Sequence, residues 1–495
     1  MTAASPLAQL TPTSLWRHFQ MLCDTPRPSK QEQAVVDKIL SFAKRHNLDA
    51  QLDQVGNVII RKAATPGMEN RQTVVLQSHL DMVTQKNNDK HHDFARDPIT
   101  PVAAGDWIRA DGTTLGADNG IGVAAILALL ESQDIPHGPL EALLTIDEEA
   151  GMTGAKGLSP NLLQGSLLFN LDTEAEGELY VGCAGGIDVN ACLEIEWQAT
   201  EVTQTALTLE VRGLLGGHSG LDIHLGRGNA NQLAALFIAR LSDALPVQIA
   251  SFNGGSLRNA IPREAEAGLV VPSQLLDAVK AAFNKFKADM QQSYQQVEPR
   301  LALSLSETPQ RPEQAMSSVQ SRLLCSALLT CPSHPLRMSD SLPGVVETSN
   351  NLARVRFEGA KVEICCLVRS LTDVARDDLA ANLCRHFQMI GADSITKGAY
   401  PGWTPNMASP LLAVMREVYR NKYHKEPAIK VIHAGLECGL LGAIYPEWDM
   451  ISFGPTIHCA HSPDEKVHIA SVAGFWDCLI AGLAAVPLAN NKGAA

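Results

Sequence analysis

The chain has 495 residues, of which 45% are hydrophobic and 19% are charged, and its formal net charge is −13 at pH 7. This length allows a large core and more than one domain. The acidic balance and the lack of a basic block argue against a nucleic acid partner, because phosphate binding needs concentrated lysine and arginine.

Helical periodicity within residues 11–47 is followed by alternating strand and helix patterns. The expected strands are solidly apolar, which is typical of parallel strands buried on both faces. We therefore expect an α/β fold with a mixed, mostly parallel sheet sandwiched by helices. The expected strands lie within residues 57–63, 72–83, 140–149 and 165–174, and a buried helix lies within 119–133.

From residue 187 the pattern changes to an alternation of period two, as in half-exposed antiparallel strands. Strand-like stretches at 188–198, 204–214, 257–271 and 353–370 are interrupted by helical stretches at 229–245, 274–296 and 377–391. We predict a catalytic domain formed by residues 1–186 and 401–495, with an α+β lid domain, residues 187–400, inserted into it. The two rounds of strand and helix patterns suggest a diverged duplication, although no residue-level repeat proves it.

The expected cellular compartment of the protein follows from both terminal segments and from the cysteines. The first 30 residues lack the basic start and apolar stretch of a signal peptide. The apolar segment 468–488 has Asp477 at its centre, and this charge favours a buried helix over a membrane span. The eleven cysteines form no CxxC pair, so we expect reduced thiols in a cytoplasmic protein.

Five segments place His, Asp or Glu where apolar runs end: "LQSHLD", "LGADNG", "TIDEEAG", "FNLDTE" and "IHCAHSPDE". In open α/β sheets, ligands bind at the carboxyl ends of the strands. Each segment alone has an ordinary explanation, as a surface or core histidine, a turn aspartate or a solvated acid pair. Together they predict a pair of divalent metal ions, because buried like charges need a cation and carboxylate and imidazole groups are metal ligands.

With the motifs "SHLDMV", "GADNGIG", "DEEAGMTGA", "NLDTE" and "AHSPDE" in this order, the chain resembles the dizinc exopeptidases and, among them, the aminoacyl-histidine dipeptidases. The resemblance extends over nearly the whole chain, including the insert. It implies that Asp118 bridges both ions and precedes a cis peptide bond. Two histidines, His458 and His461, could fill the last ligand position, and the resemblance implies His461. The complete ligand set that it implies is His79, Asp118, Glu149, Asp172 and His461.

Two further acids are the predicted catalytic residues. Asp81 follows His79 by two residues, which places both on one face of a strand and lets Asp81 accept the second imidazole N–H. Glu148 neighbours a metal-binding glutamate but points elsewhere if the backbone is extended. We predict that Glu148 is the general base, and that Asp147 lies at the strand end or supports the ligands.

In the insert, the resemblance assigns substrate binding to residues that the pattern alone would place in turns or on the surface. His218 would stabilise the oxyanion, Arg369 would bind a C-terminal carboxylate, and Asn259 would bond a carbonyl or carboxylate. Gly435 marks a close approach of the backbone to the substrate. His433 and Glu437 are weaker candidates, with the amino group of the substrate as the partner of Glu437.

The resemblance implies a dinuclear zinc dipeptidase, or one using cobalt or manganese, that acts on dipeptides with a free N-terminus, including Xaa-His dipeptides such as β-alanyl-histidine. A water molecule between the ions would attack the scissile bond, and a homodimer would form through the lid. The sequence leaves open whether His218 acts within its own chain or across that dimer. Two alternatives use the same fold: an amidohydrolase that removes acyl groups from amino acids, and a non-catalytic metal- or peptide-binding protein.

Overall fold

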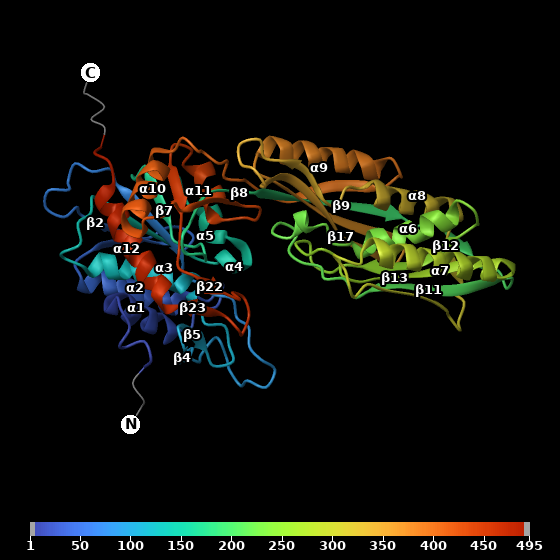
Figure 1. Ribbon diagram of the computed structural model, residues 1–495, viewed down its shortest axis with the longest axis horizontal. Helices are drawn as coiled ribbons and strands as arrows, with labels where there is room; N and C mark the ends of the chain where they lie inside the picture. Colours follow the sequence, from blue (N-terminus) through green and yellow to red (C-terminus); the bar gives the residue numbers. More distant parts are fainter. Residues whose placement is uncertain (1–4, 490–495) are drawn as a thin grey trace, which may run out of the picture. The chain divides into compact units, whose positions relative to one another are not determined.

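The computed structural model describes residues 5–489 and consists of two compact units (Figure 1). Unit 1 contains Met1–Gly182, Pro405–Val431 and Leu436–Ala495, and unit 2 contains Cys183–Thr404 and Ile432–Gly435. The chain therefore crosses between the units four times. Nothing in the sequence indicates that the four residues 432–435 belong to unit 2.

An eight-stranded sheet forms the centre of unit 1, in the order β1-β2-β6-β3-β7-β21-β8-β20. The central strands β6, β3, β7 and β21 run parallel, whereas β1 and β2 at one side and β8 at the other pair antiparallel. Strands β3, β6 and β7 are buried at every position. The expected α/β fold is confirmed. The strands are β1 (Asp49–Leu52), β2 (Val58–Lys62), β3 (Val74–His79), β6 (Leu140–Thr145), β7 (Leu167–Asn170), β8 (Glu178–Cys183), β20 (Ala428–Ile432) and β21 (Asp449–Ser452).

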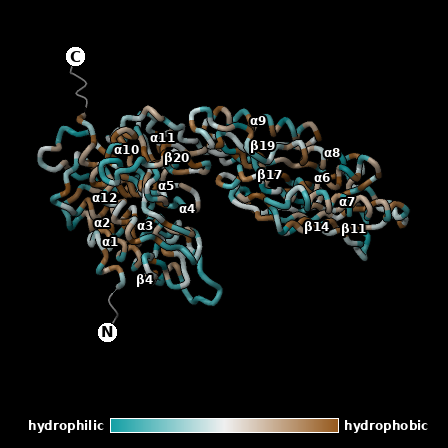
Figure 2. Tube along the Cα trace, in the orientation of Figure 1, coloured by the Kyte–Doolittle hydropathy of each residue, from teal (hydrophilic) through white to brown (hydrophobic). Residues whose placement is uncertain are grey.

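Helices cover both faces of this sheet. Val74 and Leu76 of β3 belong to a core shared with α1 (Thr13–Cys23), α2 (Gln33–Arg45), α3 (Ala117–Glu131), α10 (Pro410–Tyr423) and α12 (Ile469–Ala485). Gln77 faces the other side and bonds to α11 (Glu437–Ile444), since side chains alternate along a strand. No helix in residues 5–489 is long and apolar enough to span a membrane. Figure 2 shows hydrophobic residues throughout the helices and strands, and a hydrophilic loop before β4.

A second sheet of unit 1 has the order β22-β23-β5-β4. It joins two segments far apart in sequence, because β23 pairs antiparallel with β5. The turn between β22 and β23 carries His461, so this sheet positions that residue. Its strands are β4 (Pro101–Ala104), β5 (Trp107–Ala110), β22 (Ile457–His458) and β23 (Lys466–His468).

Unit 2 contains two halves with the same topology. The first half has the strand order β14-β11-β13-β12, and the second, read inward from the opposite edge, has the order β19-β9-β18-β17. In each half, one helix lies between the first and second strands along the chain and another lies between the third and fourth. The second strands of the halves, β12 and β17, pair antiparallel and complete one continuous sheet. This topology supports the suggested duplication, with the first half inserted after β9.

The buried residues of the four long helices form one core with one face of this sheet. The first half comprises β11 (Gln204–Arg212), α6 (Ala230–Ser242), β12 (Gln248–Gly254), β13 (Ala265–Pro272), α7 (Leu276–Ser293) and β14 (Ala302–Glu307). The second half comprises β9 (Gly185–Glu194), α8 (Ser318–Thr330), β17 (Val346–Glu358), β18 (Lys361–Ser370), α9 (Asp373–Gln388) and β19 (Asp393–Tyr400). Three short strands complete the unit: β10 (Trp197–Ala199), β15 (Gln314–Met316) and β16 (Pro335–Met338).

The prediction of one strand in unit 2 is wrong over about half of the predicted length. Residues 257–271 were expected to be extended throughout, but residues 257–264 form a loop and β13 begins at Ala265. Pro262 explains the difference, since proline has no N–H to donate to a sheet. The loop is instead joined to a neighbouring loop, because the Ile261 N–H donates to the Gly217 carbonyl.

Candidate active site

Asp118 lies between two histidines of unit 1. Its Oδ1 is 3.1 Å from His79 Nε2, and its Oδ2 is 3.2 Å from His461 Nε2. Asp172 Oδ1 is 3.3 Å from His79 Nε2, and Glu149 Oε2 is 3.1 Å from His461 Nε2. The five predicted ligands therefore form two groups that share Asp118, each with one imidazole and two carboxylates.

These distances suit two ligand atoms of a common ion. Ligand atoms at 2.0–2.1 Å from a tetrahedral zinc ion are about 3.3 Å apart. Asp172 Oδ1 makes no hydrogen bond to His79 despite its proximity, and Glu149 Oε1 is buried without a partner. Unpartnered buried carboxylate oxygens are costly, and a cation would compensate them. Imidazole and carboxylate ligands suit zinc but also cobalt and manganese.

Three of these residues follow parallel strands, but two do not. His79 ends β3, Asp172 follows β7 by two residues, and Glu149 lies just beyond β6. The expectation that all five lie at strand ends is wrong for Asp118, whereas His461 follows the short strand β22 of the second sheet by three residues. Asp118 lies in the first turn of α3, after a loop in which Gly116 has φ 70°, and its peptide bond to Asn119 is cis. His461 lies in a turn with φ 63°.

The rival histidine, His458, lies in β22 and packs against Trp107, with ring centroids 4.8 Å apart. It belongs to none of the ligand groups found in residues 5–489. The structure therefore places His458 against an aromatic ring and His461 beside Asp118.

Asp81 supports His79 and the turn that follows β6. Its Oδ1 is 3.3 Å from His79 Nδ1, and its carboxylate accepts the backbone N–H groups of Glu148 and Glu149 at 3.0 and 3.1 Å. Burial favours a raised pKa for Asp81, but hydrogen bonds from His79 and from Ser29 outweigh it and lower the pKa below its ordinary value. Asp81 therefore remains a carboxylate that orients the imidazole.

The expectation of an extended backbone at Glu148 is wrong. Strand β6 ends at Thr145, Asp147 adopts a left-handed φ of 53°, and Glu148 begins the short helix α4 (Glu148–Gly151) before α5 (Thr153–Gly157). The buried Asp147 stabilises this turn by accepting the Thr153 hydroxyl at 2.7 Å. A carboxylate atom of Glu148 lies within 4.8 Å of ligand atoms of His79 and Glu149. Burial raises the pKa of Glu148 well above its ordinary value, which suits a group that takes up a proton.

A row of buried polar side chains crosses the parallel strands just before the ligands. Gln77 donates to Glu437 Oε2 at 2.6 Å and accepts from Asn170, which in turn accepts from Ser452. Thr145 also donates to Glu437 Oε2, at 2.6 Å. Each of these five side chains is fully buried, and Glu437 Oε1 has no partner. These hydrogen bonds tie Glu437, the first residue of α11, to the central sheet. Burial raises the pKa of Glu437 to about 8.

Unit 2 brings His218 and Arg369 together. The guanidinium of Arg369 donates to the Ser219 hydroxyl at 3.2 Å and to the Tyr400 hydroxyl at 2.9 Å, and its Nη2 lies 3.3 Å from His218 Nε2. His218 Nδ1 accepts the backbone N–H groups of Gly220 and Leu221, so the proton of the neutral ring is on Nε2. Burial, followed by the charge of Arg369, lowers the pKa of His218 to about 4.

The other two predicted substrate residues belong to adjoining segments of unit 2. Asn259 is exposed, and its carbonyl accepts the Ser219 N–H at 2.8 Å. Gly435 lies in the segment 432–435, in which His433 is buried and its Nε2 lies 2.8 Å from the Ser349 hydroxyl. The loops of His218 and Asn259 are thus joined through their backbones, and no hydrogen bond of the Asn259 side chain is found in residues 5–489.

Sequence analysis missed three ionisable residues near the predicted ligands, of which Glu465 and Arg27 are buried and Glu174 is half-buried. Glu465 and Arg27 hold the turn before Asp118. Burial, followed by the charges of Asp118 and Asp172, raises the pKa of Glu174 to about 9. Two of them lie within motifs, Glu465 in "AHSPDE" and Glu174 in "NLDTE", and only the structure distinguishes them from solvated acids.

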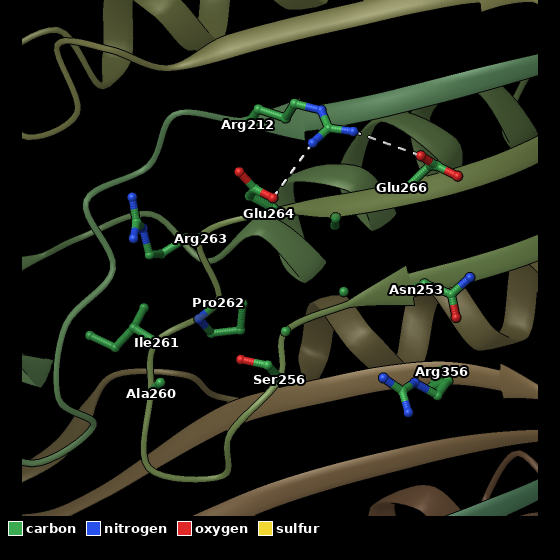
Figure 3. A pocket seen from close by; sticks show the side chains of 13 residues that line it. Arg212, Asn253, Ser256, Ala260, Ile261, Pro262, Arg263, Glu264, Glu266 and Arg356 are labelled. Atoms are coloured by element: carbon green, nitrogen blue, oxygen red, sulfur yellow. Dashed lines mark ion pairs between the residues drawn. The ribbon is translucent and has the colours of Figure 1, made fainter. Parts of the chain in front are cut away.

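A cavity of about 480 Å³ in unit 2 lies beside β11, β12 and β13 (Figure 3). Arg212 pairs with both acids of its lining, at 3.5 Å from Glu264 and 3.9 Å from Glu266. None of the predicted site residues lines it, so we assign no chemistry to this cavity.

The sequence pattern described as peptidase family M20/M25/M40 matches residues 75–479. Cytosol non-specific dipeptidase of Escherichia coli K12 is 47% identical over 484 residues, covering 98% of this chain and 99% of that protein. The crystal structure of aminoacylhistidine dipeptidase from Vibrio alginolyticus has a TM-score of 0.90 and 46% identity, covering 98% of this chain and 99% of the other. An aminopeptidase from Bacillus cereus, with 16% identity and a TM-score of 0.56 over 96% and 99% of the two chains, shares the fold.

Proposed function

This chain belongs to peptidase family M20/M25/M40, and from this premise we propose that it is a metal-dependent dipeptidase. The observation that carries the proposal is the position of Asp118, with one carboxylate oxygen beside His79 and the other beside His461. This arrangement suits a carboxylate that bridges two ions. The two relatives with nearly half of their residues identical are both named as dipeptidases, which supports the same reaction class here.

His79 and Asp172 would hold one ion, His461 and Glu149 the other, and Asp118 both. When bound, the two ions would supply an activated water molecule and positive charge for the scissile carbonyl. Asp81 orients His79, and Glu148 takes a proton and delivers it to the leaving amine. We propose zinc as the metal, with cobalt or manganese as substitutes.

In unit 2, His218 and Arg369 supply the anion-binding groups for the substrate. Their facing N–H groups are both donors, and an oxyanion or carboxylate would satisfy both. Asn259 and Gly435 provide further substrate contacts in this proposal. The substrate class is dipeptides with a free N-terminus, including Xaa-His dipeptides such as β-alanyl-histidine, in keeping with the name of the Vibrio relative.

The proposed setting is the cytoplasm, in keeping with the name of the Escherichia coli relative, without a nucleic acid or membrane partner. We propose a homodimer formed through unit 2. Val319 of α8 and Val374 of α9 are 70% and 74% exposed, and an interface formed by these helices would bury them. Light scattering of the protein and of Val319→Asp would test it, since the charge should release monomers.

Chelation and metal rescue over a substrate panel test the function. Chelator should abolish hydrolysis of dipeptides, and zinc, cobalt or manganese should restore it. N-acetylated dipeptides should react far more slowly than the free dipeptides. A preference for the acetylated forms would identify an amidohydrolase instead, and metal binding without hydrolysis of any panel member would identify a binding protein.

A further inference from the structure

Glu465 accepts four backbone hydrogen bonds from one turn. Its Oε2 accepts the N–H groups of Leu115 and Gly116 at 2.8 and 3.0 Å, and its Oε1 accepts those of Ala117 and Asp118 at 2.8 and 3.2 Å. The residue is only 2% exposed. Four consecutive backbone N–H groups of this turn therefore donate to a single carboxylate.

This contact suits the start of α3. The first N–H groups of a helix have no partner within the helix, and negative charge is favoured there. Burial raises the pKa of Glu465, but the backbone N–H groups oppose this by stabilising the charged form. Glu465 lies four residues after His461, so its side chain connects the turn that carries His461 to the turn that carries Asp118.

Arg27 makes the complementary connection on the other side of Asp118. It is 1% exposed and donates to the carbonyls of Leu80 and Asp81, both at 2.9 Å, and to the carbonyl of Gly116. Leu80 directly follows His79, so Arg27 joins the segment of His79 to the turn that Glu465 also holds. A Cβ at Gly116 would lie 2.5 Å from Arg27 Nη2, which shows how closely the guanidinium packs on this turn.

We infer that Glu465 and Arg27 are positioning residues that set the spacing of His79, Asp118 and His461 for two metal ions. The inference rests on the ligand set of the proposed function. Asp118 must present one oxygen to each half of the site, and no hydrogen bond to its carboxylate other than those of the two histidines is found in residues 5–489. The position of the Asp118 carboxylate therefore depends on the Asp118 backbone, and Glu465 accepts a hydrogen bond from that backbone directly. Loss of groups that support metal ligands commonly weakens metal binding by about 10–100-fold.

The test compares Glu465→Gln with Glu141→Gln. Glu141 is the control because it is 3% exposed, accepts the N–H groups of Gln164 and Gly165 at 2.7 and 2.9 Å, and lies in β6 away from the predicted ligands, where it also pairs with Arg61 at 3.2 Å. In each variant, an amide replaces one acceptor oxygen by a donor. Zinc affinity is measured by chelator competition, zinc content by elemental analysis, and stability by thermal unfolding of the metal-free protein.

We expect Glu465→Gln to bind at least one ion about 10–100-fold more weakly than the unaltered protein. Glu141→Gln should lose stability but bind two ions normally. Equal affinity in Glu465→Gln and the unaltered protein would overturn the inference, and so would an equal loss in Glu141→Gln. If the unaltered protein bound no ions, the proposed function would fail instead.

Arg27→Lys provides a second test that preserves the charge. Lysine cannot donate to three carbonyls with the planar geometry of a guanidinium. The cobalt-substituted variant should show an altered visible absorption spectrum, because the coordination geometry depends on the spacing of the ligands. An unchanged spectrum together with unchanged affinity would exclude a positioning role for Arg27.

Discussion

His218 Nε2 lies 3.3 Å from Arg369 Nη2, and both atoms carry protons. His218 comes from the first half of unit 2 and Arg369 from the second half of the same unit. The ring nitrogen opposite, Nδ1, already accepts two backbone N–H groups. The pair therefore needs an acceptor from outside these residues, and an anionic substrate group would provide it.

Replacing Arg369 by methionine should raise the pKa of His218 from about 4 towards its ordinary value. Removal of a neighbouring positive charge stabilises the imidazolium, while burial continues to oppose it. NMR titration of the His218 ring measures this shift. An unchanged pKa would show that burial alone sets it.

The same variant should raise the KM for dipeptides by about 10–100-fold, because a charge-assisted hydrogen bond contributes about 1.5–3 kcal/mol. Dipeptides whose C-terminus is amidated serve as the control, since they lack the carboxylate. Their kcat/KM should change little. A similar loss for both substrate forms would assign Arg369 to the structure of the site and not to carboxylate recognition.

Glu148→Gln should lower kcat by about 10²–10⁴-fold, the usual contribution of a general base, while both ions remain bound. The amide has nearly the same shape but cannot take up the proton. Elemental analysis and steady-state kinetics on the same preparation separate the two effects. Glu149→Gln is the contrasting variant, because it should lose an ion as well as activity. Near-normal turnover of Glu148→Gln would disprove the assignment.

Sequence patterns located the strands and the acids and histidines that follow them because two simple constraints coincide there. Strand β3 begins with Val74, Val75 and Leu76, and the polar residues Gln77, Ser78 and His79 at its end mark the edge of the sheet. The conformation around Glu148 could not be predicted in this way, because it depends on the left-handed φ of Asp147. Glu465 was missed because an acid after a proline resembles a solvated turn, and its partners lie 347 to 350 residues away.

Gly220→Ala should lower activity without affecting metal binding. A Cβ at this position would lie 1.8 Å from the His433 carbonyl oxygen, so the loop that carries His218 must move. Such overpacking typically costs about 1–3 kcal/mol. The measurement is kcat/KM together with zinc content. Gly226→Ala is the control in the same loop, since a Cβ there has no atom within 4 Å although its φ of 68° is strained. Equal losses in both variants would indicate general destabilisation of the loop.

Without metal ions, the protein should lose stability as the pH rises from about 5 to 8, and Glu437 should account for part of this loss. Burial raises the pKa of Glu437 from 4.5 to about 8. Between these two values the folded protein holds a proton that the unfolded chain releases, so a higher pH favours unfolding.

Glu437→Gln removes this titration while its amide oxygen can still accept from Gln77 and Thr145. Thermal unfolding in chelator should therefore depend less on pH for the variant than for the unaltered protein, with the largest difference near pH 8. Asp172 and Glu174 contribute with the same sign through their raised pKa values, so some dependence should remain. Parallel unfolding curves of the two proteins across this range would show that Glu437 is ionised throughout, and that its unpartnered oxygen is already compensated in the folded state.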